Sequence, residues 1–300
     1  MKAIIPVAGL GTRLKPFSLT HQKCLFPVGG KPVLEHILEK LVYTDIKTID
    51  LVIGHLGEQV KEFCTNYSKF EFNFIEQQKQ LGLAHAINYS LVESSEPVLI
   101  ILGDAILNLN YNKLLSSSHS TLGIYKVKEP KRFGIVELNN KQIINLVEKP
   151  EVPPSNYALI GIYYISSEKK LKNSINYIIE NNIKTKGEYQ LTDAIKNMLD
   201  NGSILNSFEV KECLDCGTIE SILRTNYEIL TSEKSNYIDN SAIIKESIIN
   251  NSTISKDCTV INSKLSNVIM LSGSSVENTS LNNAIIDNNN IVEYNIDKCL

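Results

Sequence analysis

Strand-like and helix-like segments alternate along the first 230 residues, and this alternation is the strongest constraint on the fold. Short β-branched runs end at turn residues, while the segments between them repeat apolar residues on one helical face, as at Leu34, Ile37 and Leu41. The order predicts an α/β fold with a parallel sheet covered by helices on both faces. Ligands of such sheets bind beyond the carboxyl ends of the strands. The expected strands are Lys2–Val7, Asp50–Ile53, Phe70–Ile75 and Pro97–Leu102.

Shorter strands are expected in the middle third, with Asn139 and Asn140 as a hairpin turn. These strands are Thr121–Val127, Phe133–Leu138 and Gln142–Val147. Helical patterns return at Lys169–Glu180, Tyr189–Leu199 and Thr218–Leu230.

The tail from Asp239 to Val292 has a different period. An apolar residue recurs every five or six positions, with Asn, Ser, Asp and Gly between, which is a hexapeptide-like pattern typical of a β-helix. A three-sided coil of about eighteen residues per turn gives about three turns. The alternative is a disordered Ser/Asn-rich tail, which would not explain the regular spacing. The recurring residues are Ile243, Ile248, Ile254, Val260, Leu265, Met270, Val276, Leu281, Ile286 and Ile291.

Composition excludes several classes of partner and location. The net charge is -3 with Lys and Arg scattered along the chain, so neither a nucleic acid nor a membrane surface is expected as partner. The longest apolar run, Val98 to Leu102, is far shorter than the ~20 residues of a membrane helix. Six cysteines are too few for a disulfide framework, which predicts a cytoplasmic protein. Cys213 and Cys216 form a C-x-x-C without a second pair, so zinc or redox chemistry is disfavoured.

A glycine-rich loop, Gly9-Leu10-Gly11-Thr12-Arg13, follows the first expected strand. Glycines let backbone N–H groups approach phosphates. Leu14 stands where a dinucleotide fingerprint needs glycine, and no GxxxxGK[ST] occurs. Arg13 and Lys23 flank the loop and suit a polyphosphate, although a turn with surface charges fits this segment equally well.

A series of short motifs runs through residues 1–230. The motifs are the loop from Ala8 to Pro16, Lys23–Pro32, Gly54–Glu58, Gly82–Ala86, Gly103-Asp104, Phe133-Gly134, Glu148–Pro150, Gly187–Asp193 and Asp215–Thr218. The series resembles the sugar-1-phosphate nucleotidylyltransferases, in the family's order, and most closely the glucose-1-phosphate thymidylyltransferase and UTP–glucose-1-phosphate uridylyltransferase branch. The resemblance implies a Rossmann-like domain with a mostly parallel mixed sheet over residues 1–235, and we expect a short left-handed β-helix over 236–300.

The resemblance implies that a pyrimidine nucleotide is transferred from dTTP or UTP to a hexose 1-phosphate, with glucose 1-phosphate as the expected acceptor. Pyrophosphate is released. Mg²⁺ is the implied cofactor, with Asp104 and Asp215 as its ligands. Asp104 as a helix cap is the structural alternative. The implied catalytic set is Arg13, Lys23, Asp104, Lys149 and Asp215.

The same resemblance implies a nucleotide site. Arg13 would contact the β- and γ-phosphates and Lys23 the region of the α-phosphate. Gln77, five residues before Gly82, would read the base, because an amide offers one donor and one acceptor to uracil or thymine. His85 is expected to be structural or close to the nucleotide rather than catalytic. The loop contributes Ala8, Gly9, Gly11 and Thr12.

For the sugar phosphate, the resemblance implies that Glu148 accepts hydrogen bonds from hydroxyls and that Lys149 pairs with the phosphate. Gly134 and Gly161 would allow close approach. Glu188 and Tyr163 are further candidates, with helix capping and core packing as alternatives. The sequence departs from the family pattern at Ala105, where many members carry Asn or another polar residue, and at Gln22, which replaces a proline.

Two other functions compete. A bifunctional enzyme with acetyltransfer on the β-helix is disfavoured, because that chemistry uses a histidine and none follows His119. A catalytically silent regulatory paralogue would be expected to lose charged site residues, whereas all five are present. The tail then suggests a homo-oligomer, which deletion after Asp239 and light scattering would test. Neither uracil against thymine nor the identity of the hexose is decided by the sequence.

Overall fold

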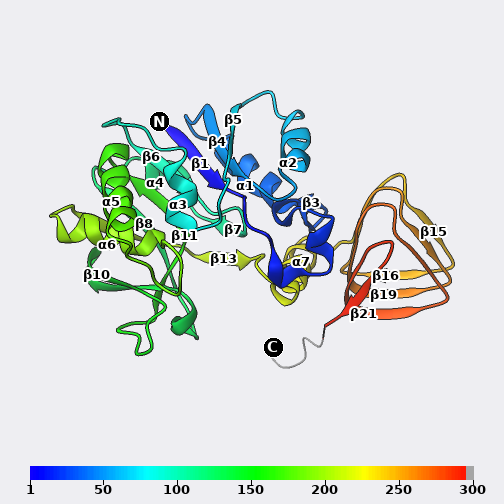
Figure 1. Cartoon of the computed structure of the whole chain (residues 1–300). Helices are drawn as coiled ribbons and strands as arrows, with labels where there is room; N and C mark the ends of the chain where they lie inside the picture. The colour runs from blue at the N-terminus through cyan, green and yellow to red at the C-terminus, as the bar shows by residue number, and fades with distance from the viewer. Residues whose placement is uncertain (295–300) are drawn as a thin grey trace. The chain divides into compact units, whose positions relative to one another are not determined.

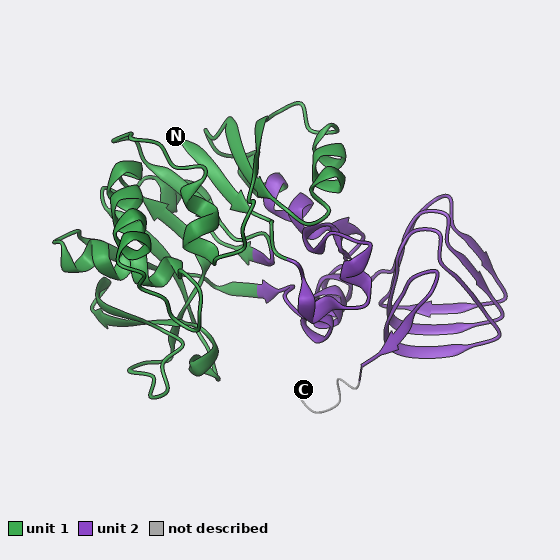
Figure 2. Ribbon diagram, viewed as in Figure 1, with its two compact units in different colours: residues 1–9, 39–103, 107–213 green, residues 10–38, 104–106, 214–300 purple. Residues whose placement is uncertain are grey.

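The computed structural model of the chain describes residues 1–294, which fall into two compact units (Figure 2). Unit 1 comprises Met1–Gly9, Glu39–Gly103 and Leu107–Cys213. Unit 2 comprises Leu10–Leu38, Asp104–Ile106 and the chain from Leu214 onward. The units divide the chain at other places than the sequence-based domains 1–235 and 236–300. The glycine loop from Leu10 on and Asp104 thus belong to the same unit as Asp215.

The sheet of unit 1 is mixed. Its strands are β1 (Lys2–Pro6), β4 (Thr48–Ile53), β5 (Glu71–Glu76), β6 (Val98–Ile101), β8 (Ser120–Lys126), β9 (Gly134–Asn139), β10 (Gln142–Glu148), β11 (Tyr157–Ile165) and β12 (Leu205–Glu209). Within residues 1–294 they form a nine-stranded sheet in the order β5-β4-β1-β6-β11-β8-β12-β10-β9 (Figure 1). β5, β4, β1 and β6 are parallel, as the alternation predicts.

The sheet is mixed, as the family resemblance implies, and the parallel order that the alternation predicts ends at β11, which runs antiparallel between β6 and β8. The chain enters β11 from the β9–β10 hairpin and not through a crossover helix, so no parallel connection is imposed. Asn140 occupies the left-handed region in that hairpin, with φ of 56°, as its turn position predicts.

Helices of unit 1 pack on this sheet. The helices within unit 1 are α2 (Gly57–Cys64), α3 (Leu83–Asn88), α4 (Tyr111–Leu115), α5 (Glu168–Glu180) and α6 (Leu191–Asp200), while α1 (Val33–Leu41) begins in unit 2 and ends in unit 1. Ile4, Val52 and Ile100 share a buried cluster with apolar residues of α3, α5 and α6. The alternate residues Ile5 and Leu51 point to the opposite face and are also fully buried, so both faces of the parallel part are covered. No helix of residues 1–294 is long and apolar enough to cross a membrane.

A buried ion cluster joins the first strand to its neighbours. The Lys2 ammonium lies 2.8 Å from Asp50 Oδ2 and 3.1 Å from Glu168 Oε1, and it donates to the carbonyl of Ser90. Asn73 also donates to Asp50, so the carboxylates are hydrogen-bonded as well as paired. Removing one partner from such a cluster typically costs about 3–5 kcal/mol, because it leaves an uncompensated buried charge.

Unit 2 is built around helix α7 (Ile219–Glu233). Asn226 of α7 is fully buried, and its amide contacts two distant segments. Oδ1 accepts from the N–H of Gly29, at 3.0 Å, and from Thr253 Oγ1, at 2.6 Å. Nδ2 donates to the carbonyl of Asn251, at 3.3 Å. One amide therefore joins α7 to the hairpin of β2 (Pro27–Val28) and β3 (Lys31–Pro32) and to the tail.

The tail is a stack of short parallel strands (Figure 1). Partner residues are 16 apart, as in Ile243 with Thr259 and Thr259 with Ser275. The tail is therefore made of regularly paired strands, in contrast to the alternative of a disordered tail. The strands are β14 (Tyr237–Ile238), β15 (Ile243–Lys245), β16 (Ile248–Asn250), β17 (Thr253–Ile254), β18 (Thr259–Ile261), β19 (Lys264–Met270), β20 (Ser275–Glu277) and β21 (Ser280–Ile286), followed by β22 (Ile291–Glu293), which is antiparallel to β21.

One turn of the tail takes 16 residues, so the expectation of about eighteen residues per turn is wrong. The residues at the bends between successive strands, the corners of the coil, account for this length. One residue at each corner adopts the left-handed conformation, and these residues follow one another at intervals of five or six. Asn and Gly tolerate that conformation. Stacked corner asparagines also hydrogen-bond across turns, as Asn267 does with Asn283 at 2.8 Å. The corner residues are Glu246, Asn251, Asp257, Asn262, Asn267, Gly273, Asn278 and Asn283.

Two further short strands, β7 (Ala105–Asn108) and β13 (Glu212–Asp215), pair as a two-stranded sheet next to Asp104 and at Asp215. The 3₁₀ turns η1 (Thr12–Leu14), η2 (Phe17–Leu19) and η3 (Lys23–Leu25) carry the glycine loop and Lys23, and η4 (Pro130–Arg132) precedes β9.

Candidate active site

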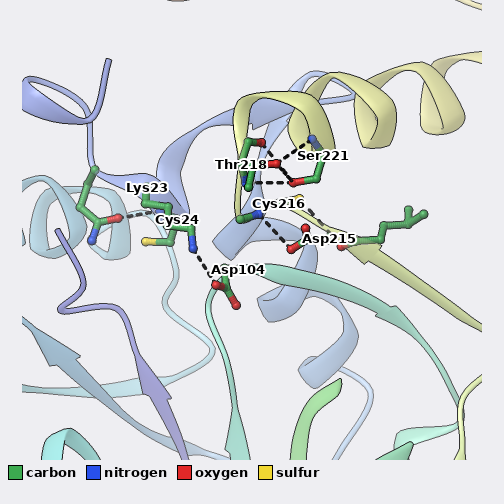
Figure 3. Close-up of polar contacts among 10 residues, drawn as sticks. Lys23, Cys24, Asp104, Asp215, Cys216, Thr218 and Ser221 are labelled. Atoms are coloured by element: carbon green, nitrogen blue, oxygen red, sulfur yellow. Dashed lines mark hydrogen bonds and ion pairs between the residues drawn. The ribbon is translucent and has the colours of Figure 1, made fainter. Parts of the chain in front are cut away.

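Lys23 and Asp104 form a short ion pair in unit 2 (Figure 3). Lys23 Nζ lies 2.6 Å from Asp104 Oδ2, and the two side chains are 16% and 34% exposed. The backbone carbonyl of Asp104 accepts from the N–H of Cys216 at 2.8 Å. The strand end that carries Asp104 is therefore fixed against the turn that carries Asp215.

Asp215 is oriented by the turn that begins α7. Its Oδ1 accepts from the N–H of Gly217 at 3.0 Å, and its carbonyl accepts from Thr225 Oγ1 at 2.9 Å. The Thr218 hydroxyl accepts from the Ser221 N–H while the Ser221 hydroxyl accepts from the Thr218 N–H, which is a reciprocal helix cap. The carboxylate of Asp215 is exposed and thus accessible to a ligand.

Glycines bring the two cations close to the carboxylates. A Cβ on Gly217 would lie 3.2 Å from Arg13 Nη2 and 3.0 Å from Asp215 Oδ1, so the guanidinium lies beside this turn. A Cβ on Gly11, whose φ is 61°, would lie 3.5 Å from Lys23 Cβ. Unit 2 thus brings together four of the five residues expected to be catalytic, Arg13, Lys23, Asp104 and Asp215.

This donor set fits a magnesium ion bound with phosphates. Mg²⁺ is commonly held by one or two carboxylates, with substrate phosphates and water completing its octahedron. Among residues 1–294, no group of three or more His, Cys, Asp or Glu residues is placed to hold a metal ion. A site of two carboxylates leaves positions for substrate phosphates and water. The Cys216 thiol beside Asp215 is buried, and this burial raises its pKa above the usual value.

The sugar-site candidates of unit 1 meet where β9 and β10 pair. Gly134 lies opposite Glu148 in the ladder, and a Cβ on Gly134 would lie 2.9 Å from Glu148 Oε2. That carboxylate oxygen accepts from Thr192 Oγ1 at 2.7 Å. Lys149 Nζ lies 3.3 Å from Glu148 Oε1. Thr192 was not among the residues expected from the sequence, although it lies in the Gly187–Asp193 motif.

Lys149 lines a cavity of about 590 Å³ together with Lys131 and Lys186. Lys149 has a φ of 42°, a conformation that is uncommon for a residue with a side chain. Glu151 also lines the cavity, so its lining carries a net positive charge and suits an anion. Sequence reasoning missed Lys131 and Lys186, because isolated loop lysines carry no periodic signal; the position of Lys186 directly before the Gly187–Asp193 motif was the available clue.

The nucleotide candidates of unit 1 occupy the loops after β1 and β5. The backbone N–H of Gln77 donates to the carbonyl of Ile53, at 2.9 Å. Gly82 has a φ of 116°, and a Cβ there would lie 2.6 Å from the carbonyl oxygen of Tyr189. Gln80 Nε2 donates to the carbonyl of Ala8, at 3.1 Å. A Cβ on Gly9 would meet no atom within 4 Å, which leaves open space beside the loop.

Two of the sugar-site candidates, Tyr163 and Gly161, do not line the cavity beside Lys149. Tyr163 is 4% exposed and belongs to the hydrophobic cluster of unit 1, as its core-packing alternative expects. Gly161 has a φ of 81° and packs against Leu102, whose N–H donates to its carbonyl at 2.8 Å. Glu188 is exposed and accepts from Gln190 Nε2 at 3.2 Å.

Known proteins are similar to this chain in sequence and in fold. Residues 2–232 match the family model described as nucleotidyl transferase. The chain is 36% identical over 256 residues to the bifunctional protein GlmU of Methanococcus maripaludis strain C7, covering 83% of this chain and 60% of that protein.

Two solved structures are also similar. A putative glucose-1-phosphate thymidylyltransferase from Bacillus anthracis, in complex with a sucrose, is 30% identical with a TM-score of 0.64, over 76% of this chain and 95% of that chain. A UDP-glucose pyrophosphorylase complexed with UDP-glucose shares the fold, with a TM-score of 0.67 at 23% identity, over 77% of this chain and 98% of that chain.

The chain belongs to the nucleotidyl transferase family, and within it to the sugar-1-phosphate nucleotidyltransferases. The α/β nucleotidyltransferase fold expected from its motifs is confirmed by these structural neighbours. The chain spans about 60% of the length of the GlmU relative, so the activity of that whole protein is not assigned to this chain.

Asp193 supplies a pH-dependent prediction. Its Oδ2 is buried without a hydrogen-bond partner among residues 1–294, and burial, followed by the charge of Glu148, raises its pKa above the usual value. Ionised Asp193 therefore destabilises the fold above its raised pKa, and this penalty disappears once pH falls below the pKa of the unfolded chain, about 3.9. We expect Asp193→Asn to increase the free energy of unfolding at pH 7 and to lose that advantage on acidification. Urea unfolding at several pH values measures both; an equal gain at every pH would contradict it.

Proposed function

We propose that this protein transfers a pyrimidine nucleotide from dTTP or UTP to a hexose 1-phosphate, with glucose 1-phosphate as the expected acceptor. The observation that supports it is the grouping of Arg13, Lys23, Asp104 and Asp215 in unit 2. Two carboxylates that could hold a divalent cation and two cations that could bind a triphosphate thus lie in one unit. The cationic cavity beside Lys149 supports a second anionic substrate.

In the proposed reaction, a phosphate oxygen of the sugar 1-phosphate attacks the α-phosphorus of the nucleotide. The bond to the bridging oxygen of the β-phosphate breaks, and pyrophosphate leaves. Lys23 stabilises the charge that develops at the α-phosphate, and Arg13 binds the leaving pyrophosphate. Asp104 and Asp215 would hold Mg²⁺, which would supply further neutralisation of the phosphate charges. Lys149 and Glu148 hold the acceptor, which gives catalysis by positioning.

The ion pair between Lys23 and Asp104 also stabilises the site before substrates bind. Each charge compensates the other while no substrate is bound, so neither is left unpaired in a half-buried position. With substrates bound, Asp104 would hold the metal and Lys23 would pair with a phosphate, so each of these side chains would keep a partner of opposite charge.

We also propose that residues 236–294 form a left-handed β-helix that follows a catalytic domain of residues 1–235; the last six residues of the expected range 236–300 lie outside the described residues. The 16-residue turns and their parallel ladders support this. The turn direction can be checked in an experimental structure, where a right-handed coil would contradict it.

Pyrophosphate release tests the function. The full chain is assayed with Mg²⁺ while dTTP, UTP, CTP, ATP and GTP are each combined with several sugar 1-phosphates. Release with dTTP or UTP and one sugar supports the proposal and identifies the substrates. No release in any combination, from folded protein, would support a catalytically silent regulatory paralogue instead.

Asp104→Asn is expected to lower kcat by at least about a hundredfold, because a metal ligand loses its charge and Lys23 loses its partner. Steady-state kinetics at several Mg²⁺ concentrations measure this, with Asp45→Asn, an exposed carboxylate of unit 1, as the matched control. A kcat close to that of the parent protein would contradict the assignment of Asp104.

Lys149→Ala is expected to raise the KM for the sugar phosphate by about tenfold or more, because one charged contact to phosphate is lost, and to leave the KM for the nucleotide nearly unchanged. Lys141→Ala, an exposed lysine in the β9–β10 hairpin, serves as control. Equal changes in both KM values would remove Lys149 from the sugar-phosphate site.

A further inference from the structure

We propose that His85 is a positioning residue that orients the amide of Gln77, so that the nucleotide site selects a base with an N3–H group, uracil or thymine, over cytosine. The inference rests on the proposed function, because it assumes that Gln77 reads the base. It assigns a specificity role to a residue whose sequence context suggested only a structural or nucleotide-adjacent one.

The geometry places the two side chains together within unit 1. Gln77 Nε2 lies 3.5 Å from His85 Nδ1, which is a long hydrogen bond. The main chain of Gln77 is held by its own hydrogen bond to Ile53 at the end of β4. The imidazole is held by the ring of Tyr89, the residue directly after α3, which meets it edge-on with ring centroids 5.1 Å apart. Both partners are therefore fixed, and the contact between them depends on which atoms face each other.

The tautomer of His85 follows from the atom that faces it. Gln77 Nε2 is an amide nitrogen, which donates and does not accept, so His85 Nδ1 accepts this hydrogen bond. A neutral imidazole carries one N–H, which therefore lies on the other ring nitrogen, Nε2.

The charge state of His85 is consistent with that role. Burial lowers the pKa of the imidazole below its usual value, and the positive charge of Lys79 lowers it further. The ring is therefore neutral at pH 7. It can accept a hydrogen bond from an amide NH₂, whereas a protonated ring would offer only donors.

An accepting Nδ1 fixes the orientation of the Gln77 amide. Nε2 must face His85, which leaves Oε1 and the second N–H of Nε2 for the base. Uracil and thymine present an N3–H donor and an O4 acceptor, which match this pair. Cytosine presents an N3 acceptor and an N4 donor, which match the flipped amide. Because the flip would turn Oε1 toward the lone pair of Nδ1, His85 disfavours the orientation that cytosine needs.

Substitutions of His85 separate this role from packing. Phenylalanine keeps an aromatic ring against Tyr89 but has no acceptor, so the Gln77 amide is free to flip. Asparagine loses the ring but can place a carbonyl oxygen near the position of Nδ1. Tyr89→Phe keeps the ring contact and changes no atom that touches Gln77, so it serves as the control.

The experiment compares UTP with CTP in the full chain, with one sugar 1-phosphate. The ratio of kcat/KM for UTP to that for CTP is expected to fall about tenfold in His85→Phe, the equivalent of one hydrogen bond of about 1.4 kcal/mol. It is expected to remain within about threefold of the parent ratio in His85→Asn and Tyr89→Phe. Thermal unfolding of each variant verifies that it is folded, and His85→Leu replaces His85→Phe if the latter does not fold.

Calorimetric titration of the same variants with UTP and CTP alone measures base selection without turnover. A loss of selectivity in His85→Phe with its recovery in His85→Asn supports the inference. An unchanged ratio in folded His85→Phe or His85→Leu overturns it, whether measured by turnover or by binding. Selective binding of UTP without any turnover would refute the proposed transferase and leave the role of His85 to be judged from the titrations.

Discussion

The buried amide of Asn226 is the contact on which unit 2 depends. Three segments that are far apart in the sequence, around Gly29, Asn226 and Thr253, meet at this side chain, which has no exposure to solvent. Each of its hydrogen bonds replaces one to water, and a buried polar group left unsatisfied costs about 1–3 kcal/mol. The hairpin after Lys23, the helix after Asp215 and the stacked tail are therefore held in one arrangement. Lys23 and Asp215, which directly precede two of these segments, are therefore positioned by the same contact.

The same unit shows how polar groups are made compatible with close packing. Gly29 and Gly30 turn with φ values of 56° and 84°, and a Cβ on Gly29 would lie 2.4 Å from Ile229. Near the carboxylates, Gly217 leaves room for Arg13. Charges are compensated pairwise, as Lys23 and Asp104 are. The half-buried ammonium of Lys23 therefore has a carboxylate partner in the substrate-free protein.

Much of the fold was predictable, because it follows from local patterns. The first strands and helices α5 and α6 lie within one or two residues of their expected bounds, and α7 ends three residues later than expected, since each has a clear apolar period. β11 and β12 were not predicted. β11 is buried on nearly every position, and such a run has no alternation to mark it. The spacing of the tail was visible, but its 16-residue turn depends on single left-handed corner residues, which the apolar pattern does not count.

The sequence by itself determined the family, the order of strands and helices, and the charged residues available for chemistry, because short motifs and apolar periods are local properties of the chain. Only the tertiary structure decided which of those residues meet. It placed Lys23 against Asp104, 81 positions away, buried Tyr163 in the core, and brought Thr192 to Glu148. It also placed His85 Nδ1 beside Gln77. Contacts between distant residues depend on the packing of whole elements, and that packing is a property of the folded chain.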